Sequence, residues 1–102
     1  MHERILNFIK SFQDFGTGVI DCFTSGNCYY FAIILQTRFG GSDACPIVYD
    51  VVANHFATQI MGHIYDITGE VTDNYLWQYW EDLKQNYDPL VIERIYRDCI
   101  FK

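Results

Sequence analysis

The chain has 102 residues and a formal net charge of −6 at pH 7, and half of its residues are hydrophobic. This length allows one domain, residues 1–102, and the apolar content is enough to form a compact core. The negative charge argues against binding to a nucleic-acid backbone, because that binding depends on Lys and Arg. It leaves ordinary solubility or an acidic surface that meets a basic partner.

Neither a membrane segment nor an export signal is expected. No stretch approaches the roughly 18 unbroken apolar residues of a membrane helix. Residues 1–5 lack the basic region and apolar run of a signal peptide. Four cysteines stand at positions 22, 28, 45 and 99. Without an export signal, we expect reduced thiols in the cytoplasm and no disulfide framework.

The N-terminal part predicts two helices separated by a loop. Residues 3–14 carry apolar side chains at helical spacing and predict an amphipathic helix. Residues 15–27 are rich in Gly and Ser and predict mainly loop. Residues 28–39 predict a buried central helix, with Asn27 as its N-cap and Gly40 after its last residue. The apolar stripe of this helix consists of Cys28, Phe31, Ala32, Leu35 and Phe39.

Strands are predicted in the middle of the chain. Residues 47–49 form a short strand candidate after a proline. Residues 53–60 and 63–67 predict a hairpin around the two-residue turn Met61-Gly62. Gly69 is expected to end the ladder.

Two helices are predicted after the strands. Residues 73–87 place Leu76, Tyr79, Trp80 and Leu83 on a helical stripe. Asp88-Pro89 predicts an N-cap and a first-turn proline of a last helix. The element order predicts an α+β fold, in which an antiparallel sheet packs on a central helix.

A thiol, an imidazole and a carboxylate fall on neighbouring predicted elements. Cys28 follows the N-cap of the central helix, and a helix N-terminus lowers the pKa of a thiol from its ordinary value of ~8.5. The backbone N–H of Cys28 is also placed to donate to an oxyanion. His55 lies on the first strand of the hairpin and Asp66 on the second.

The length of the hairpin turn decides whether His55 and Asp66 meet. With Met61-Gly62 as a two-residue turn, Ala57 pairs with Asp66, which then shares a face with His55 at roughly 7–8 Å between backbones. A four-residue turn places them directly opposite, whereas a three-residue turn places them on opposite faces. In the favourable registers, Asp66 binds one ring nitrogen of His55 and leaves the other for Cys28.

The sequence around these positions resembles a known family. The segments are residues 26–32 (Gly-Asn-Cys-Tyr-Tyr-Phe-Ala), His55-Phe56 and residues 65–69 (Tyr-Asp-Ile-Thr-Gly). They are similar to the three motifs of the transglutaminase-like branch of the papain-like superfamily, over residues 24–70. The resemblance implies a papain-like core, a central helix packed on a small antiparallel sheet, with extra N- and C-terminal helices.

The same resemblance implies acyl transfer through a thioester, without a cofactor. Cys28 would be the nucleophile, His55 the general base and then the acid, and Asp66 the group that orients His55. The expected function is that of a small hydrolase or acyltransferase (peptidase, amidase or deamidase) acting on an amide or isopeptide bond of a protein or peptide.

Two departures from that family concern substrate binding. Papain carries its oxyanion-hole glutamine six residues before the cysteine, where this chain has Cys22. Asn27 and Ser25 are candidate substitutes. The chain is also short for the family, so we expect a homodimer or a protein partner to complete the substrate cleft.

A non-catalytic function is the main alternative. Short length and negative charge also suit a small acidic binding or inhibitor protein, of the type encoded by phages or mobile elements, on a papain-like scaffold with a buried Cys28. A zinc site is a further alternative, but the usual Cys-x-x-Cys and His-x-x-x-His spacings are absent. Its candidate ligands are Cys22, Cys28, Cys45, His55 and His63.

Two further side chains lie outside the Cys28–His55–Asp66 group. His63 lies beside the turn and is predicted at the surface, facing away from His55. Trp77 falls off the helical stripe of residues 73–87, so it is either part of an exposed interaction patch or partly buried under the last helix.

Overall fold

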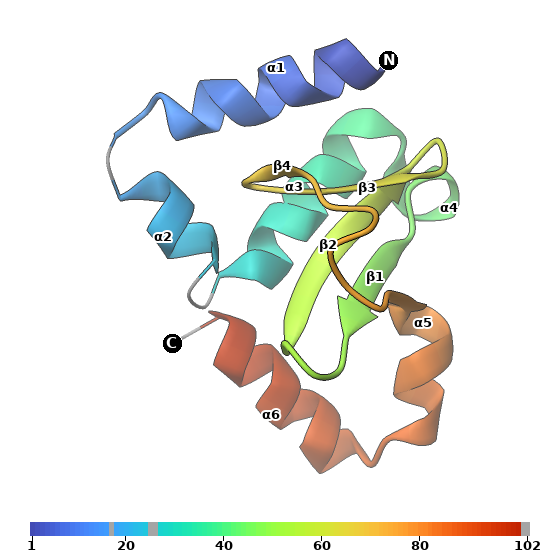
Figure 1. Ribbon diagram of the computed structural model, residues 1–102. Coiled ribbons are helices and arrows are strands. Elements are labelled where there is room, and N and C mark those ends of the chain that lie inside the picture. Colours follow the sequence, from blue (N-terminus) through green and yellow to red (C-terminus); the bar gives the residue numbers. More distant parts are fainter. Residues whose placement is uncertain (17, 25–26, 101–102) are drawn as a thin grey trace.

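The computed structural model describes residues 1–16, 18–24 and 27–100, and shows helices and a sheet in the order helices, strands, helices (Figure 1). The helices are α1 (His2–Gln13), α2 (Val19–Thr24), α3 (Cys28–Phe39), α4 (Gly41–Ala44), α5 (Trp80–Leu83), the 3-10 helix η1 (Lys84–Asn86) and α6 (Pro89–Ile100). The strands are β1 (Ile47–Asp50), β2 (His55–Ile60), β3 (His63–Asp66), β4 (Gly69–Glu70) and β5 (Gln78–Tyr79). In the described part of the chain, no helix is long and apolar enough to cross a membrane.

The strands form one antiparallel sheet in the order β4-β3-β2-β1-β5, which confirms the predicted α+β class. The hairpin of β2 and β3 has the predicted two-residue turn. Met61 and Gly62 both have positive φ, 52° and 85°, as a type I′ turn requires. Ile60 therefore pairs with His63, the register that the two-residue turn predicts.

Helices α1, α3 and α6 cover one face of the sheet. Alternation along β2 turns Phe56, Thr58 and Ile60 toward this face, where each is buried against the helices. The Thr58 hydroxyl donates a hydrogen bond of 2.7 Å to the carbonyl oxygen of Ala32 in α3. This bond joins the first half of the central helix directly to the middle of the central strand.

The segment between β4 and β5 crosses the opposite face of the sheet (Figure 1). Val48, Ala57 and Ile64 of three adjacent strands pack there with Val71. Trp77 packs against this cluster, and its indole N–H donates to the Val71 carbonyl at 3.0 Å. Residues 71–77 thus form an irregular cover over the face that carries His55.

Three predictions about the elements were wrong. Residues 73–87 do not form one helix; irregular chain leads into β5, and helical turns begin only at Trp80. Leu76 and Tyr79 are consequently exposed, because the helical stripe to which they were assigned does not exist. The predicted loop 15–27 contains α2. Gly69 does not end the ladder; it begins β4, which pairs with β3.

Candidate active site

Cys28 is the first residue of the central helix, as predicted. The N-cap of α3 is Asn27, whose backbone has φ −111° and whose side chain makes no capping hydrogen bond. The Cys28 side chain lies in a cluster with Ala32 and Phe56, and only 5% of the residue is exposed. The thiol therefore lies at the junction of the helix N-terminus and the start of β2.

His55 and Asp66 form a buried pair. His55 is the first residue of β2 and Asp66 the last of β3, and the hairpin register places them on one face of the sheet. His55 Nε2 and Asp66 Oδ2 are 2.8 Å apart. The other carboxylate oxygen accepts hydrogen bonds from the backbone N–H and the hydroxyl of Thr68, at 2.8 and 2.6 Å. The donors from Thr68 therefore hold the carboxylate in its orientation toward the imidazole.

The surroundings of His55 favour the imidazolium. Burial lowers the pKa of His55, but hydrogen bonds to Asp66 and Cys28 and the charges of those two groups raise it, to about 9. Burial also raises the pKa of Asp66, while the hydrogen bonds from His55 and Thr68 outweigh it and hold that pKa below its ordinary value. The pair is thus an ionised carboxylate beside a protonated ring at neutral pH.

Carboxylate, imidazole and thiol therefore lie in a chain of contacts. Asp66 faces Nε2 of His55, which leaves Nδ1 as the second ring nitrogen, and Cys28 contributes to the electrostatics of the ring through a hydrogen bond and its charge. Such an arrangement can hold a thiolate beside an imidazolium and later return a proton to a leaving group.

Asn27 and Ser25 are the two candidate oxyanion residues. The Asn27 side-chain amide donates to the Cys22 carbonyl at 3.1 Å, so it joins the end of α2 to the start of α3. Ser25 lies outside the described residues. The oxyanion role of both remains a prediction.

An aromatic cover over His55 was not predicted from the sequence. The rings of Tyr75 and Trp77 have centroids 5.4 and 6.0 Å from the His55 ring, and they contact each other at 4.8 Å. Trp77 is partly buried, but against this face of the sheet and not under the last helix. The alternation of Tyr75, Trp77 and Tyr79 was the available signal, since a period of two predicts extended chain.

A buried carboxylate was missed as well. Asp50 ends β1, pairs with His55 across the strands and is buried on the same face. Its two oxygens accept hydrogen bonds from the backbone N–H groups of Ala53 and Leu76, at 2.7 and 2.9 Å. Asp50 therefore joins the β1–β2 loop to the segment that covers His55.

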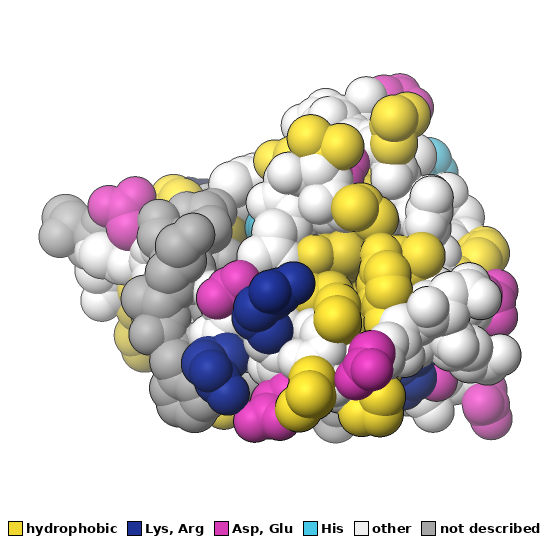
Figure 2. Space-filling model, turned by 90° about the horizontal axis from the view of Figure 1, so that it is seen from below, with side chains coloured by type: hydrophobic (Ala, Val, Ile, Leu, Met, Phe, Trp, Pro, Cys, Tyr) yellow, Lys and Arg dark blue, Asp and Glu magenta, His cyan; other side chains and the backbone are white. Residues whose placement is uncertain are grey.

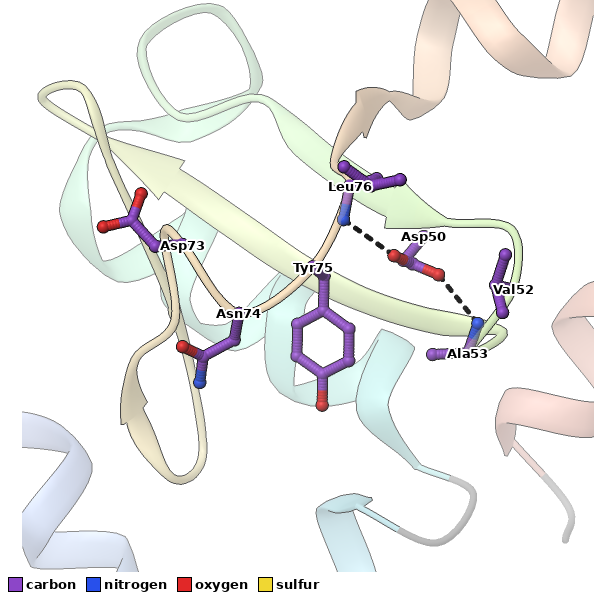
Figure 3. Close-up of a pocket in the computed structure, with 7 residues that line it drawn as sticks. All are labelled: Asp50, Val52, Ala53, Asp73, Asn74, Tyr75 and Leu76. Atoms are coloured by element: carbon purple, nitrogen blue, oxygen red, sulfur yellow. Dashed lines mark hydrogen bonds between the residues drawn. The ribbon is translucent and has the colours of Figure 1, made fainter.

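An open pocket of about 470 Å³ lies beside the hydrogen bonds that Asp50 accepts (Figure 3). It is lined by Asp50, Val52, Ala53, Asp73, Asn74, Tyr75 and Leu76. Tyr75 lines the pocket and also contacts the His55 ring, so the pocket adjoins the Cys28–His55–Asp66 group.

Of the candidate zinc ligands, only Cys28 and His55 are in contact in the described part of the chain. Cys22 is exposed on α2, whereas the Cys45 thiol is buried and donates to the Phe39 carbonyl at 3.4 Å. His63 is exposed, as predicted, and its Nδ1 lies 2.8 Å from a carboxylate oxygen of Glu70. Within residues 1–16, 18–24 and 27–100, no three His, Cys, Asp or Glu side chains are grouped closely enough to hold a metal ion.

A family model described as phage YunG-like protein matches residues 5–96. No curated protein and no solved structure matches the chain. The family match contradicts the assignment to the papain-like and transglutaminase-like superfamily, which was wrong. The short motifs around Cys28, His55 and Asp66 carried that assignment, and they cover less of the chain than the model does.

Proposed function

The chain belongs to the phage YunG-like family, and from its thiol–imidazole–carboxylate group we propose that it is a small cysteine-dependent hydrolase or acyltransferase. The bond acted on is an amide or isopeptide bond of a protein or peptide. One observation carries the proposal: His55 is held by Asp66 and also interacts with Cys28. Buried groups with strongly perturbed pKa values beside a pocket are typical of catalytic sites.

The proposed reaction has two steps. The Cys28 thiolate attacks the amide carbonyl, and the resulting tetrahedral intermediate breaks its C–N bond as the His55 imidazolium gives its proton to the leaving amine. Water or an acceptor amine then attacks the thioester, and neutral His55 takes the proton from it. The thioester C–S bond breaks and returns the thiolate. Asp66 holds the ring orientation in both steps.

The remaining parts of the proposal concern the scaffold and the partners. A central helix that begins with the thiol and packs on an antiparallel sheet supports a core of the papain-like layout, without membership of that family. The reactivity of a thiolate suits the reducing cytoplasm. The substrate is a protein or peptide, and a second copy of the chain or a protein partner would complete the substrate cleft, because 102 residues leave little chain to build one.

Acyl transfer can be tested with p-nitrophenyl acetate. We expect nitrophenolate release together with an acetyl group on Cys28, detected by peptide mass spectrometry, in the wild type. His55→Ala should lose both signals, whereas the surface variant His63→Ala should retain them. Acetylation that spreads equally over Cys22 and Cys45, or that survives in His55→Ala, would contradict the proposal.

A non-catalytic phage-type binding or inhibitor protein is the second candidate. The family match, the net charge of −6 and the burial of Cys28 favour it. On this hypothesis Cys28 is an inert core residue, and capture of a basic protein partner survives Cys28→Ser. The enzyme hypothesis requires the same substitution to abolish function.

A further inference from the structure

The pocket beside Tyr75 has no part in the two reaction steps. Its walls come from the β1–β2 loop and from the segment that precedes β5 (Figure 3). Its volume of about 470 Å³ lies within the range of ligand pockets, about 300–1,000 Å³. Tyr75 both lines the pocket and contacts the His55 ring, with the ring centroids 5.4 Å apart, so the pocket lies on the far side of Tyr75 from the imidazole.

The pocket exposes apolar side chains that the fold does not use. Val52 is 93% exposed and Leu76 83% exposed, so neither contributes its apolar surface to the core. Exposed apolar side chains that line a pocket are typical of a ligand-binding site. Figure 2 separately shows hydrophobic side chains gathered on the face of the molecule seen from below.

The charges around the pocket are unequal. Asp50 is buried and both of its oxygens accept backbone N–H groups, so its carboxylate shapes the pocket and has little capacity left for a cation. Asp73 is exposed and stands at the end of the pocket opposite to Val52 and Ala53 (Figure 3). An apolar surface with one exposed carboxylate at its end complements an apolar side chain that has a cation beside it.

We propose that this pocket binds an apolar side chain of a peptide substrate, with a neighbouring Lys or Arg of that peptide paired to Asp73. The apolar residue lies next to the residue whose carbonyl Cys28 attacks. The inference rests on the proposed function, because it names the substrate class of the same site. Pairing with Asp73 would also favour basic peptides as substrates of this acidic chain.

Peptide chloromethyl ketones test this inference, because the Cys28 thiolate displaces their chloride and remains alkylated. The probes are acetyl-Lys-Leu-Gly, acetyl-Lys-Ser-Gly and acetyl-Glu-Leu-Gly chloromethyl ketones. Rates of Cys28 labelling are measured by mass spectrometry and divided by the iodoacetamide rate of the same variant. We expect the Leu probe to react about tenfold faster than the Ser probe. We expect Lys to be favoured over Glu by about threefold.

Matched variants locate each preference. Leu76→Ser should reduce the preference for Leu, and Leu90→Ser, which removes another exposed leucine (75% exposed) on α6, should not. Asp73→Asn should reduce the preference for Lys, and the exposed Asp43→Asn on α4 should not.

The failures can be told apart. If iodoacetamide labelling is fast and depends on His55 but the probes react equally, the pocket inference is overturned and the thiol chemistry stands. A side-chain preference that survives Leu76→Ser also overturns it. If iodoacetamide labelling is slow and independent of His55, both the pocket inference and the proposed function fail.

Discussion

Replacing Asp66 by Asn should lower the pKa of His55 markedly. The gap between its ordinary 6.5 and about 9 corresponds to roughly 3 kcal/mol in protonation free energy. Asp66 and Cys28 supply this energy against a burial effect of opposite sign. Without the carboxylate, we expect the pKa of His55 to fall by about one pH unit or more. Asn keeps an oxygen for the two donors of Thr68, so the turn is preserved.

The assay is an NMR titration of the histidine ring protons between pH 5 and pH 10, with His55 assigned by His55→Gln. Cys28→Ser is the companion variant, because it removes the thiolate and should also lower the pKa of His55. Asp43→Asn is the matched control and should leave the titration unchanged, since Asp43 makes no part of the site. A wild-type His55 that titrates near 6.5, or a value unaffected by Asp66→Asn, would refute the reasoning.

Further predictions concern stability, measured by urea unfolding. The pKa of Asp66 is lowered in the folded chain, so the stability that the ionised carboxylate contributes is present above the ordinary carboxyl pKa and is lost as the pH falls through the folded pKa. The free energy of unfolding of the wild type should therefore exceed that of Asp66→Asn at neutral pH, and this difference should disappear in acid. Thr58→Val should cost about 1 kcal/mol through the lost bond to Ala32, and no cost would show that this bond does not fix α3. Met61→Asn should stabilise the chain by about 0.5–1 kcal/mol, because Asn adopts positive φ more readily; destabilisation would contradict the type I′ turn. Leu35→Ala should cost about 2–5 kcal/mol, since Leu35 is fully buried, and a cost under 1 kcal/mol would contradict its core position.

Elements were predicted correctly from the sequence where local signals and burial agree. The helix from Cys28 has an N-cap, an apolar stripe and a terminal glycine, and all three correspond to its observed bounds. The segment 73–87 failed because its helical spacing was fortuitous; pairing of residues 78–79 with β1 outweighs helix propensity there. The short helix α2 was missed because glycine and serine flank it and its six residues carry little periodicity.

The candidate site was predictable where strand alternation determines it. Period two and a two-residue turn place His55 and Asp66 on one face, and the observed register confirms that placement. Asp50 and Tyr75 were not predicted, because their proximity to His55 depends on a crossing segment whose path is set by long-range hydrogen bonds. The alternation of Tyr75 with Trp77 and Tyr79 indicates extended chain but not its position over His55, and Asp50 has no comparable signal.

The central claim is that His55 activates Cys28, and the rate of Cys28 alkylation by iodoacetamide against pH tests it most directly. In the wild type we expect fast labelling with an apparent titration well below the ~8.5 of an ordinary thiol. His55→Ala should remove that acceleration, while Cys22, exposed on α2, serves as an internal reference in both proteins. Slow labelling of Cys28 at the same rate with and without His55 would contradict the enzyme hypothesis and favour the acidic binding protein.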